Sequence, residues 1–175
     1  MVRSFNLMVQ VEDDGQGNLN DDAVITVYIT DVNETPVISN QSFVLNENSQ
    51  TGTVVGTIAA SDPDDGQTLT FGITSGNPGN AFAINPATGQ LTVNNPAAMN
   101  YELIQSFTLT VTVTDDGAGN LSDNASIIIN LNDVNEVPII NNQSFVVEAT
   151  IGNGELVGIV TASDPDQDNR QNIQL

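Results

Sequence analysis

Acidic residues gather in pairs at regular points of this 175-residue chain, and such pairs could bind a metal ion. They lie beside turn residues or between apolar segments, at Asp13-Asp14, Asp31 with Glu34, Asp62 with Asp64, Asp115-Asp116, Asp133 with Glu136, and Asp164 with Asp166. Neighbouring carboxylates repel one another and raise each other's pKa unless a cation lies between them. Ca²⁺ is the expected cation because it takes about six to eight oxygen ligands in flexible geometry, whereas Mg²⁺ prefers fewer protein ligands.

The composition favours binding of hard cations and excludes several other chemistries. The chain has 22 Asp plus Glu against 2 Lys plus Arg, a formal net charge of -20 and no His, Cys or Trp. The absence of Lys, His and Cys excludes their use in covalent catalysis, zinc sites and disulfides, and soft metals would need the same residues. Nucleic acid is excluded as a partner because the chain cannot replace its counterions. Aromatic residues make up 5% of the chain, too few for a glycosidase cleft, and we expect no enzyme.

An internal repeat sets the domain organisation. The segment that begins at Phe5 recurs from Phe107, and the same shift of 102 residues aligns Ser61-Asp-Pro-Asp with Ser163-Asp-Pro-Asp. We therefore expect residues 1–32 to be the C-terminal part of one repeat, 33–134 a complete repeat, and 135–175 the N-terminal part of a third. Half a repeat cannot bury its apolar face, so the chain is expected to be an excerpt from a tandem array.

The apolar residues of the complete repeat follow the period of two that is typical of strands. Alternation is regular at 107–113 and 127–131, and shorter runs occur at 43–45, 69–73 and 91–93 and at positions 54, 55, 58 and 60. About seven short antiparallel strands in about 100 residues predict an all-β fold, a Greek-key β-sandwich of immunoglobulin-like architecture. The expected core includes Phe43, Phe71, Phe82, Phe107 and Leu109.

Several motifs resemble those of cadherin repeats, in the order and at the spacing of that family. Asp31-Val-Asn-Glu-Thr-Pro36 and Asp133-Val-Asn-Glu-Val-Pro138 resemble the linker between two repeats. The other matches are Phe43-Val-Leu-Asn-Glu47-Asn48 with the first strand, Asp62-Pro-Asp64, Asn100-Tyr-Glu102, and Leu109 to Gly117 with the end of a late strand. The asparagine-rich, lysine-free composition is similar to that of cadherin-like repeats in large bacterial surface adhesins.

The resemblance implies a set of calcium ligands at each junction between repeats. The upstream junction would use Asn33 and Glu34 of the linker with Asp62, Asp64 and Asp115. The downstream junction would use Glu47, Asn100, Glu102, Asp133, Asn135, Glu136, Asp164 and Asp166. Glu34 and Glu136 stand where the family usually has Asp, and Asn100 also replaces an Asp, so fewer or weaker sites are expected.

The expected function is therefore a calcium-stiffened cadherin-like module of a large extracellular or cell-surface protein that acts in cell adhesion. Its expected partners are calcium, the neighbouring repeats of the same chain, and another cell-surface protein or a glycan. The membrane or envelope anchor would lie in other parts of the parent protein. The alternative is a carbohydrate- or protein-recognition module of a secreted multidomain protein, with the loop from Thr74 to Ala81 as the candidate contact.

Overall fold

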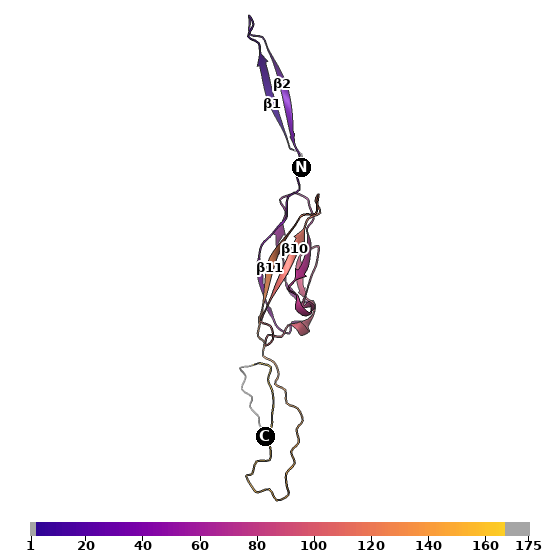
Figure 1. The fold of residues 1–175 in the computed structure, drawn as a ribbon, viewed down its shortest axis with the longest axis vertical. Coiled ribbons are helices and arrows are strands. Elements are labelled where there is room, and N and C mark those ends of the chain that lie inside the picture. Colours follow the sequence, from indigo (N-terminus) through magenta and orange to yellow (C-terminus); the bar gives the residue numbers. More distant parts are fainter. Residues whose placement is uncertain (1–2, 167–175) are drawn as a thin grey trace.

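The computed structural model describes residues 3–166 as an elongated chain with three parts (Figure 1). A hairpin of β1 (Arg3–Glu12) and β2 (Asn20–Ile29) lies at one end, a strand-rich body lies in the middle, and an extended segment lies at the other end. The body contains β3 (Val37–Ile38), β4 (Gln41–Asn46), β5 (Val54–Thr57), β6 (Ala60–Ser61), β7 (Thr70–Ser75), η1 (Pro78–Asn80), β8 (Phe82–Ile84), β9 (Gln90–Val93), η2 (Pro96–Ala98), β10 (Ser106–Thr114) and β11 (Ser122–Asn132).

The strands of the body form two principal sheets. One has the order β4-β11-β10-β7 and the other β5-β9-β8, while β3 and β6 form a short pair. All pairs are antiparallel except β4 with β11, which runs parallel from Gln41 opposite Ile127 to Asn46 opposite Asn132. The expectation that every strand is antiparallel is therefore wrong for β4. The period of two gives which face a strand buries, but it carries no information on strand direction.

The core lies between the two sheets and follows the alternation seen in the sequence. Leu109, Leu91, Ile127 and Ile129 are fully buried. Phe82 of one sheet meets Phe107 of the other edge to face, with ring centroids 5.0 Å apart, a favoured aromatic geometry. The predicted core is confirmed for Phe82, Phe107 and Leu109, whereas Phe43 and Phe71 are half-buried and pack against the core at its margin.

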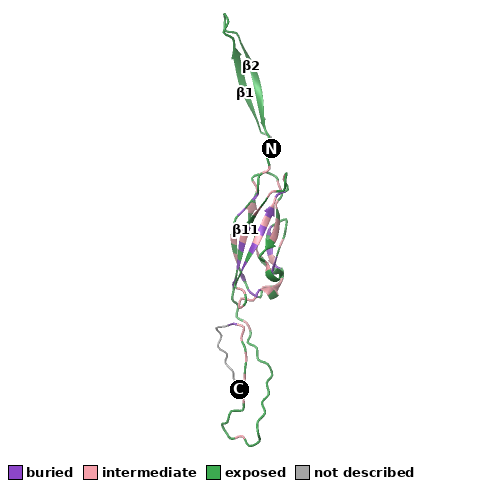
Figure 2. Ribbon diagram, in the orientation of Figure 1, coloured by how far each residue is buried: buried purple, intermediate pink, exposed green. Residues whose placement is uncertain are grey.

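The hairpin of β1 and β2 has the same apolar alternation as β10 and β11, but its residues are exposed (Figure 2). Phe5 and Leu7 are 55% and 52% exposed, whereas their repeat equivalents Phe107 and Leu109 are buried. The difference arises because, among the described residues, no second sheet packs on β1 and β2. Side chains with the same apolar alternation are therefore buried only where an opposite sheet packs on them.

The extended segment after β11 carries one isolated bridge, in which Ile139 pairs with Ser163. The expected third part, 135–175, includes positions 167–175, which lie outside the described residues. Between residues 3 and 166, no helix has the length and apolar character needed to cross a membrane.

Candidate metal centres

Four carboxylates converge where the body meets the extended segment. One oxygen from each of Glu47, Glu102, Asp133 and Asp166 lies within 4.8 Å of the others, and we call these four residues the downstream cluster. Glu47 follows β4, Glu102 lies in the turn before β10, Asp133 follows β11, and Asp166 belongs to the extended segment. The cluster therefore joins residues that are far apart in the sequence, as a shared ion site would require.

Glu47 is the most buried member of the downstream cluster, with 2% of its surface exposed. The backbone N–H groups of Tyr101 and Val134 each donate to its carboxylate at 2.8 Å. These charge-assisted hydrogen bonds fix the position of the carboxylate. They also attach the turn that carries Glu102 and the start of the linker to the end of β4.

Glu136 connects the linker to both sides of this junction. Its carboxylate accepts a hydrogen bond from the side-chain amide of Asn48 at 2.7 Å, and its backbone N–H donates to Asp166 at 2.6 Å. The backbone N–H of Asp166 in turn donates to Asp164 at 3.1 Å. The linker, the body and the extended segment are therefore held in one hydrogen-bonded group.

The remaining residues expected at this junction have local partners. The Asn100 side-chain oxygen accepts from the Leu103 backbone N–H at 2.9 Å and so closes the turn that carries Glu102. The Asn135 side-chain amide donates to the backbone carbonyl of Glu136 at 3.2 Å. Both residues lie beside the downstream cluster in the chain, and their part in ion binding stays a prediction.

The pKa of Glu102 reports the crowding of negative charge. A hydrogen bond from its own backbone N–H is the largest single influence and lowers this pKa. Burial and the negative charges of Glu47, Glu136 and Asp133 act together in the opposite direction and raise the pKa above its ordinary value. The protein supplies little opposing charge, because the whole chain has two Lys plus Arg residues.

The upstream junction repeats the hydrogen bonds of the downstream linker among five predicted ligands, which we call the upstream cluster: Asn33, Glu34, Asp62, Asp64 and Asp115. The backbone N–H of Glu34 donates to Asp64 at 2.7 Å, and that of Asp64 donates to Asp62 at 2.9 Å. These are the bonds that Glu136, Asp166 and Asp164 make at the other junction, shifted by one repeat. The two linkers therefore hold their Asp-Pro-Asp turns in the same way.

Asp115 is buried, with 3% of its surface exposed, and anchors the upstream cluster to the end of β10. One of its oxygens accepts from the backbone N–H groups of Gly117 at 3.1 Å and Leu121 at 3.0 Å. The other accepts from the side-chain amide of Asn33 at 3.1 Å. Asp115 thus shapes the loop between β10 and β11 and orients Asn33 of the linker.

Both junctions bury oxygens that lack a hydrogen-bond donor, whereas among the described residues only the downstream carboxylates all lie within 4.8 Å of one another. Asp62 Oδ2, Gln67 Oε1, Glu102 Oε2 and Glu136 Oε2 are buried atoms without a hydrogen-bond partner. A buried oxygen without a donor destabilises a fold, and an oxygen-seeking cation would remove that cost. Of these four, Gln67 was missed by the sequence reasoning, because a single Gln in a turn matches no acidic motif.

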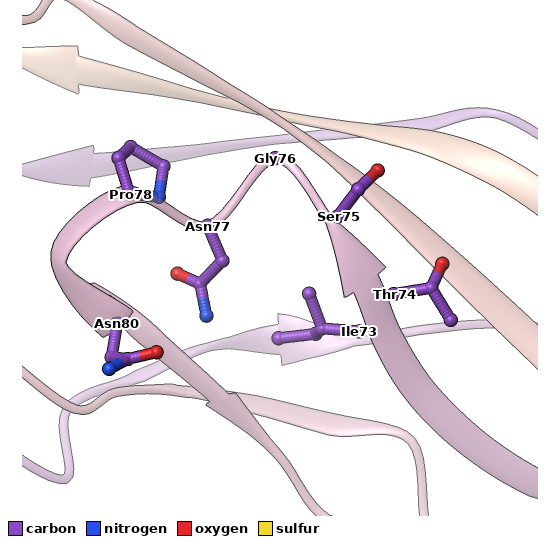
Figure 3. A pocket seen from close by; sticks show the side chains of 7 residues that line it. All are labelled: Ile73, Thr74, Ser75, Gly76, Asn77, Pro78 and Asn80. Atoms are coloured by element: carbon purple, nitrogen blue, oxygen red, sulfur yellow. The ribbon is translucent and has the colours of Figure 1, made fainter.

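The loop proposed for ligand recognition surrounds an open hollow of about 580 Å³ (Figure 3). It is lined by Ile73, Thr74, Ser75, Gly76, Asn77, Pro78 and Asn80. The side chain of Asn77 accepts from the Phe82 backbone N–H and donates to its carbonyl, at 3.0 and 2.9 Å, which fixes the loop. No aromatic side chain lines the hollow, so it offers no stacking surface for a sugar ring.

Comparisons with known proteins show which proteins this chain is similar to. The sequence profile described as "Cadherin domain" matches residues 41–132. The chain is 30% identical to the mouse protein "Cadherin EGF LAG seven-pass G-type receptor 2" over 178 aligned positions, which cover 99% of this chain and 6% of the relative. It is 32% identical to mouse "Protocadherin Fat 4", with 95% of this chain and 3% of the relative covered.

Solved structures show the same likeness. The extracellular domain of Protocadherin GammaB4 superposes with a TM-score of 0.69 at 27% identity, covering 93% of this chain and 29% of that chain. The chain thus spans a small fraction of the relatives that it matches. The two relatives named above are animal proteins, and the likeness to bacterial adhesins stays a prediction.

Proposed function

The chain belongs to the cadherin family, and we propose that its two acidic junctions bind Ca²⁺ and fix the angle between successive repeats of an extracellular adhesion protein. Cadherins and protocadherins mediate cell adhesion, and cadherin domains are adhesion modules rather than enzymes. Cadherin domains generally bind calcium, and the described residues contain an acidic cluster that could hold a metal ion. The predicted all-β fold class is confirmed by the likeness to cadherin structures.

The observation that carries the proposal is the downstream cluster. Its four carboxylates lie within 4.8 Å of one another and repel one another, most strongly where Glu47 and Asp166 are buried away from water. Glu47 and Glu102 come from the body, Asp133 from the linker and Asp166 from the extended segment. Without a cation this repulsion favours separation of the two parts.

A calcium ion would supply positive charge and accept oxygens from both sides of the junction. Glu47 would be the fixed ligand, because its two backbone hydrogen bonds hold it in place. Glu102 and Glu136 would each offer a buried oxygen that has no hydrogen-bond partner. At the upstream junction Asp62 would do the same, with Asp64, Asp115, Asn33 and Glu34 around it.

The division of the chain into 1–32, 33–134 and 135–175 belongs to the same proposal. It is supported by the repeated hydrogen bonds of the two linkers and by the apolar faces of β1 and β2, which have the sequence pattern of buried strands. We also propose that the chain is extracellular, because its relatives are cell-surface proteins. The partners of the proposed module are calcium and the neighbouring repeats.

Calorimetric titration with Ca²⁺ tests the proposal. We expect heat of binding for the 175-residue chain, and a loss of part of it in a Glu102→Gln variant that keeps the shape of the side chain. An exposed acidic residue outside both clusters, Glu12, gives the matched control Glu12→Gln, which should bind as the original chain does. Absence of calcium binding at millimolar concentrations would contradict the proposed function.

A further inference from the structure

The upstream junction contains an oxygen that neither the acidic pairs nor the family motifs include. Gln67 lies in the turn between the Asp62-Pro-Asp64 motif and β7, and its Oε1 is buried without a hydrogen-bond donor. The same residue lines a hollow of about 280 Å³ together with Asn33, Asp64 and Gly117. This uncharged side chain therefore lies beside two members of the upstream cluster, Asn33 and Asp64.

One hydrogen bond of its own and two made by neighbouring residues hold Gln67 in place. Its side-chain amide donates to Asn33 Oδ1, and Asn33 in turn donates to Asp115, so the three side chains form one chain of hydrogen bonds. The backbone N–H of the next residue, Thr68, donates to Asp116 at 2.8 Å, which fixes the turn to the loop between β10 and β11. With the amide nitrogen directed toward Asn33, the carbonyl oxygen is left for another partner.

Gly117 allows this close approach. A Cβ added at position 117 would collide with Asn33 Oδ1 and would lie 2.6 Å from Gln67 Oε1. Both amide side chains therefore pack directly over the Gly117 backbone, in the space that a side chain at this position would fill. The loop is thus shaped to accept Gln67 beside the upstream cluster.

We propose that Gln67 is a calcium ligand of the upstream junction, bound through its side-chain carbonyl oxygen. The inference rests on the proposed calcium binding and adds one neutral ligand to Asn33, Glu34, Asp62, Asp64 and Asp115. Ca²⁺ accepts neutral carbonyl oxygens from amide side chains as well as carboxylates, and the charge of the ligand set tunes its affinity. Gln67 contributes an oxygen without adding repulsion to the carboxylates beside it.

A pair of substitutions with opposite expected effects tests the inference by calorimetry on the 175-residue chain. Gln67→Leu removes the oxygen and should weaken the upstream site about tenfold, as expected for loss of one contact to a charged group. Gln67→Glu keeps an oxygen at the same place and adds charge, so it should bind Ca²⁺ more tightly than the original chain. Gln105→Leu, at an exposed position outside both clusters, is the control and should leave binding unchanged.

The heat of Ca²⁺ binding at the upstream junction is identified by its loss in the Asp62→Asn variant. The heat of binding at the downstream junction is identified by its loss in the Glu102→Gln variant. A second readout is the nuclear magnetic resonance signal of the Gln67 side-chain amide, which should shift when Ca²⁺ is added. If both Gln67 variants bind as the original chain does, or if Gln67→Glu weakens binding as Gln67→Leu does, Gln67 only positions Asn33 and the inference is wrong. If the original chain binds no Ca²⁺, the proposed function fails and this inference fails with it.

Discussion

Replacing Glu47 by Gln should lower the stability of the body in calcium much more than in a chelator. In the chelator, two effects oppose each other. The variant removes a charge that repels three neighbouring carboxylates, all within 4.8 Å of one another. It also weakens the hydrogen bonds from Tyr101 and Val134, because an amide offers one acceptor oxygen instead of two, at a cost of about 1–3 kcal/mol. Because Glu47 has three carboxylate neighbours, the relieved repulsion offsets the weakened hydrogen bonds, and without calcium the variant should be no less stable than the original chain.

In calcium the downstream site loses a carboxylate ligand. A tenfold weaker affinity removes about 1.4 kcal/mol of stabilisation at saturating calcium. For a body of this size, that energy corresponds to a fall in melting temperature of roughly 6–10 °C. Thermal unfolding followed by circular dichroism, in calcium and in chelator, measures both values.

Asp123→Asn is the matched control for this experiment. Asp123 accepts a hydrogen bond from the Ile38 backbone N–H at 3.3 Å and belongs to neither cluster. Its loss should therefore lower the melting temperature equally in both conditions. An equal fall for Glu47→Gln in calcium and in chelator would refute the reasoning, because it would give Glu47 a purely structural role.

Three further substitutions separate ion binding from folding. Asp62→Asn should weaken the upstream calcium site and leave the downstream site unchanged in a calorimetric titration; loss of both heats would contradict independent junctions. Gly76→Ala should destabilise the body by roughly 2 kcal/mol or more with and without calcium, because Gly76 has φ +77° and an added Cβ would collide with the Thr108 carbonyl oxygen; an unchanged denaturant midpoint would contradict this packing. Phe82→Ala should cost about 3–5 kcal/mol in the same assay, since it opens the core beside Phe107, and a loss below 1 kcal/mol would argue against the core described above.

The sequence pattern predicts the core of this fold better than its connections. Alternation in β10 and β11 gives the buried face directly, because each strand has one apolar side. The short strands β3 and β8 are harder to predict, since runs of two or three residues show no period. The parallel pairing of β4 depends on the path of the chain around the sandwich, which local alternation does not contain.

Part of the candidate sites could also be read from the sequence. The repeated acidic linkers place Glu34 with Asp64 and Glu136 with Asp166, and the structure brings these residues together. The role of Gln67 required coordinates, because its importance comes from one buried oxygen and from the contact with Gly117. Whether these residues bind calcium stays a proposal.

The central claim is that calcium fixes the angle between two repeats, and a distance measurement across the downstream junction tests it most directly. The chain has no Cys, so two spin labels can be attached at Asn124→Cys on β11 and Ile140→Cys in the extended segment, both of which are exposed positions. Double electron–electron resonance should give one narrow distance distribution in calcium and a broad one in chelator. Equally broad or equally narrow distributions in the two conditions, with calcium binding verified in the same sample, would contradict the account.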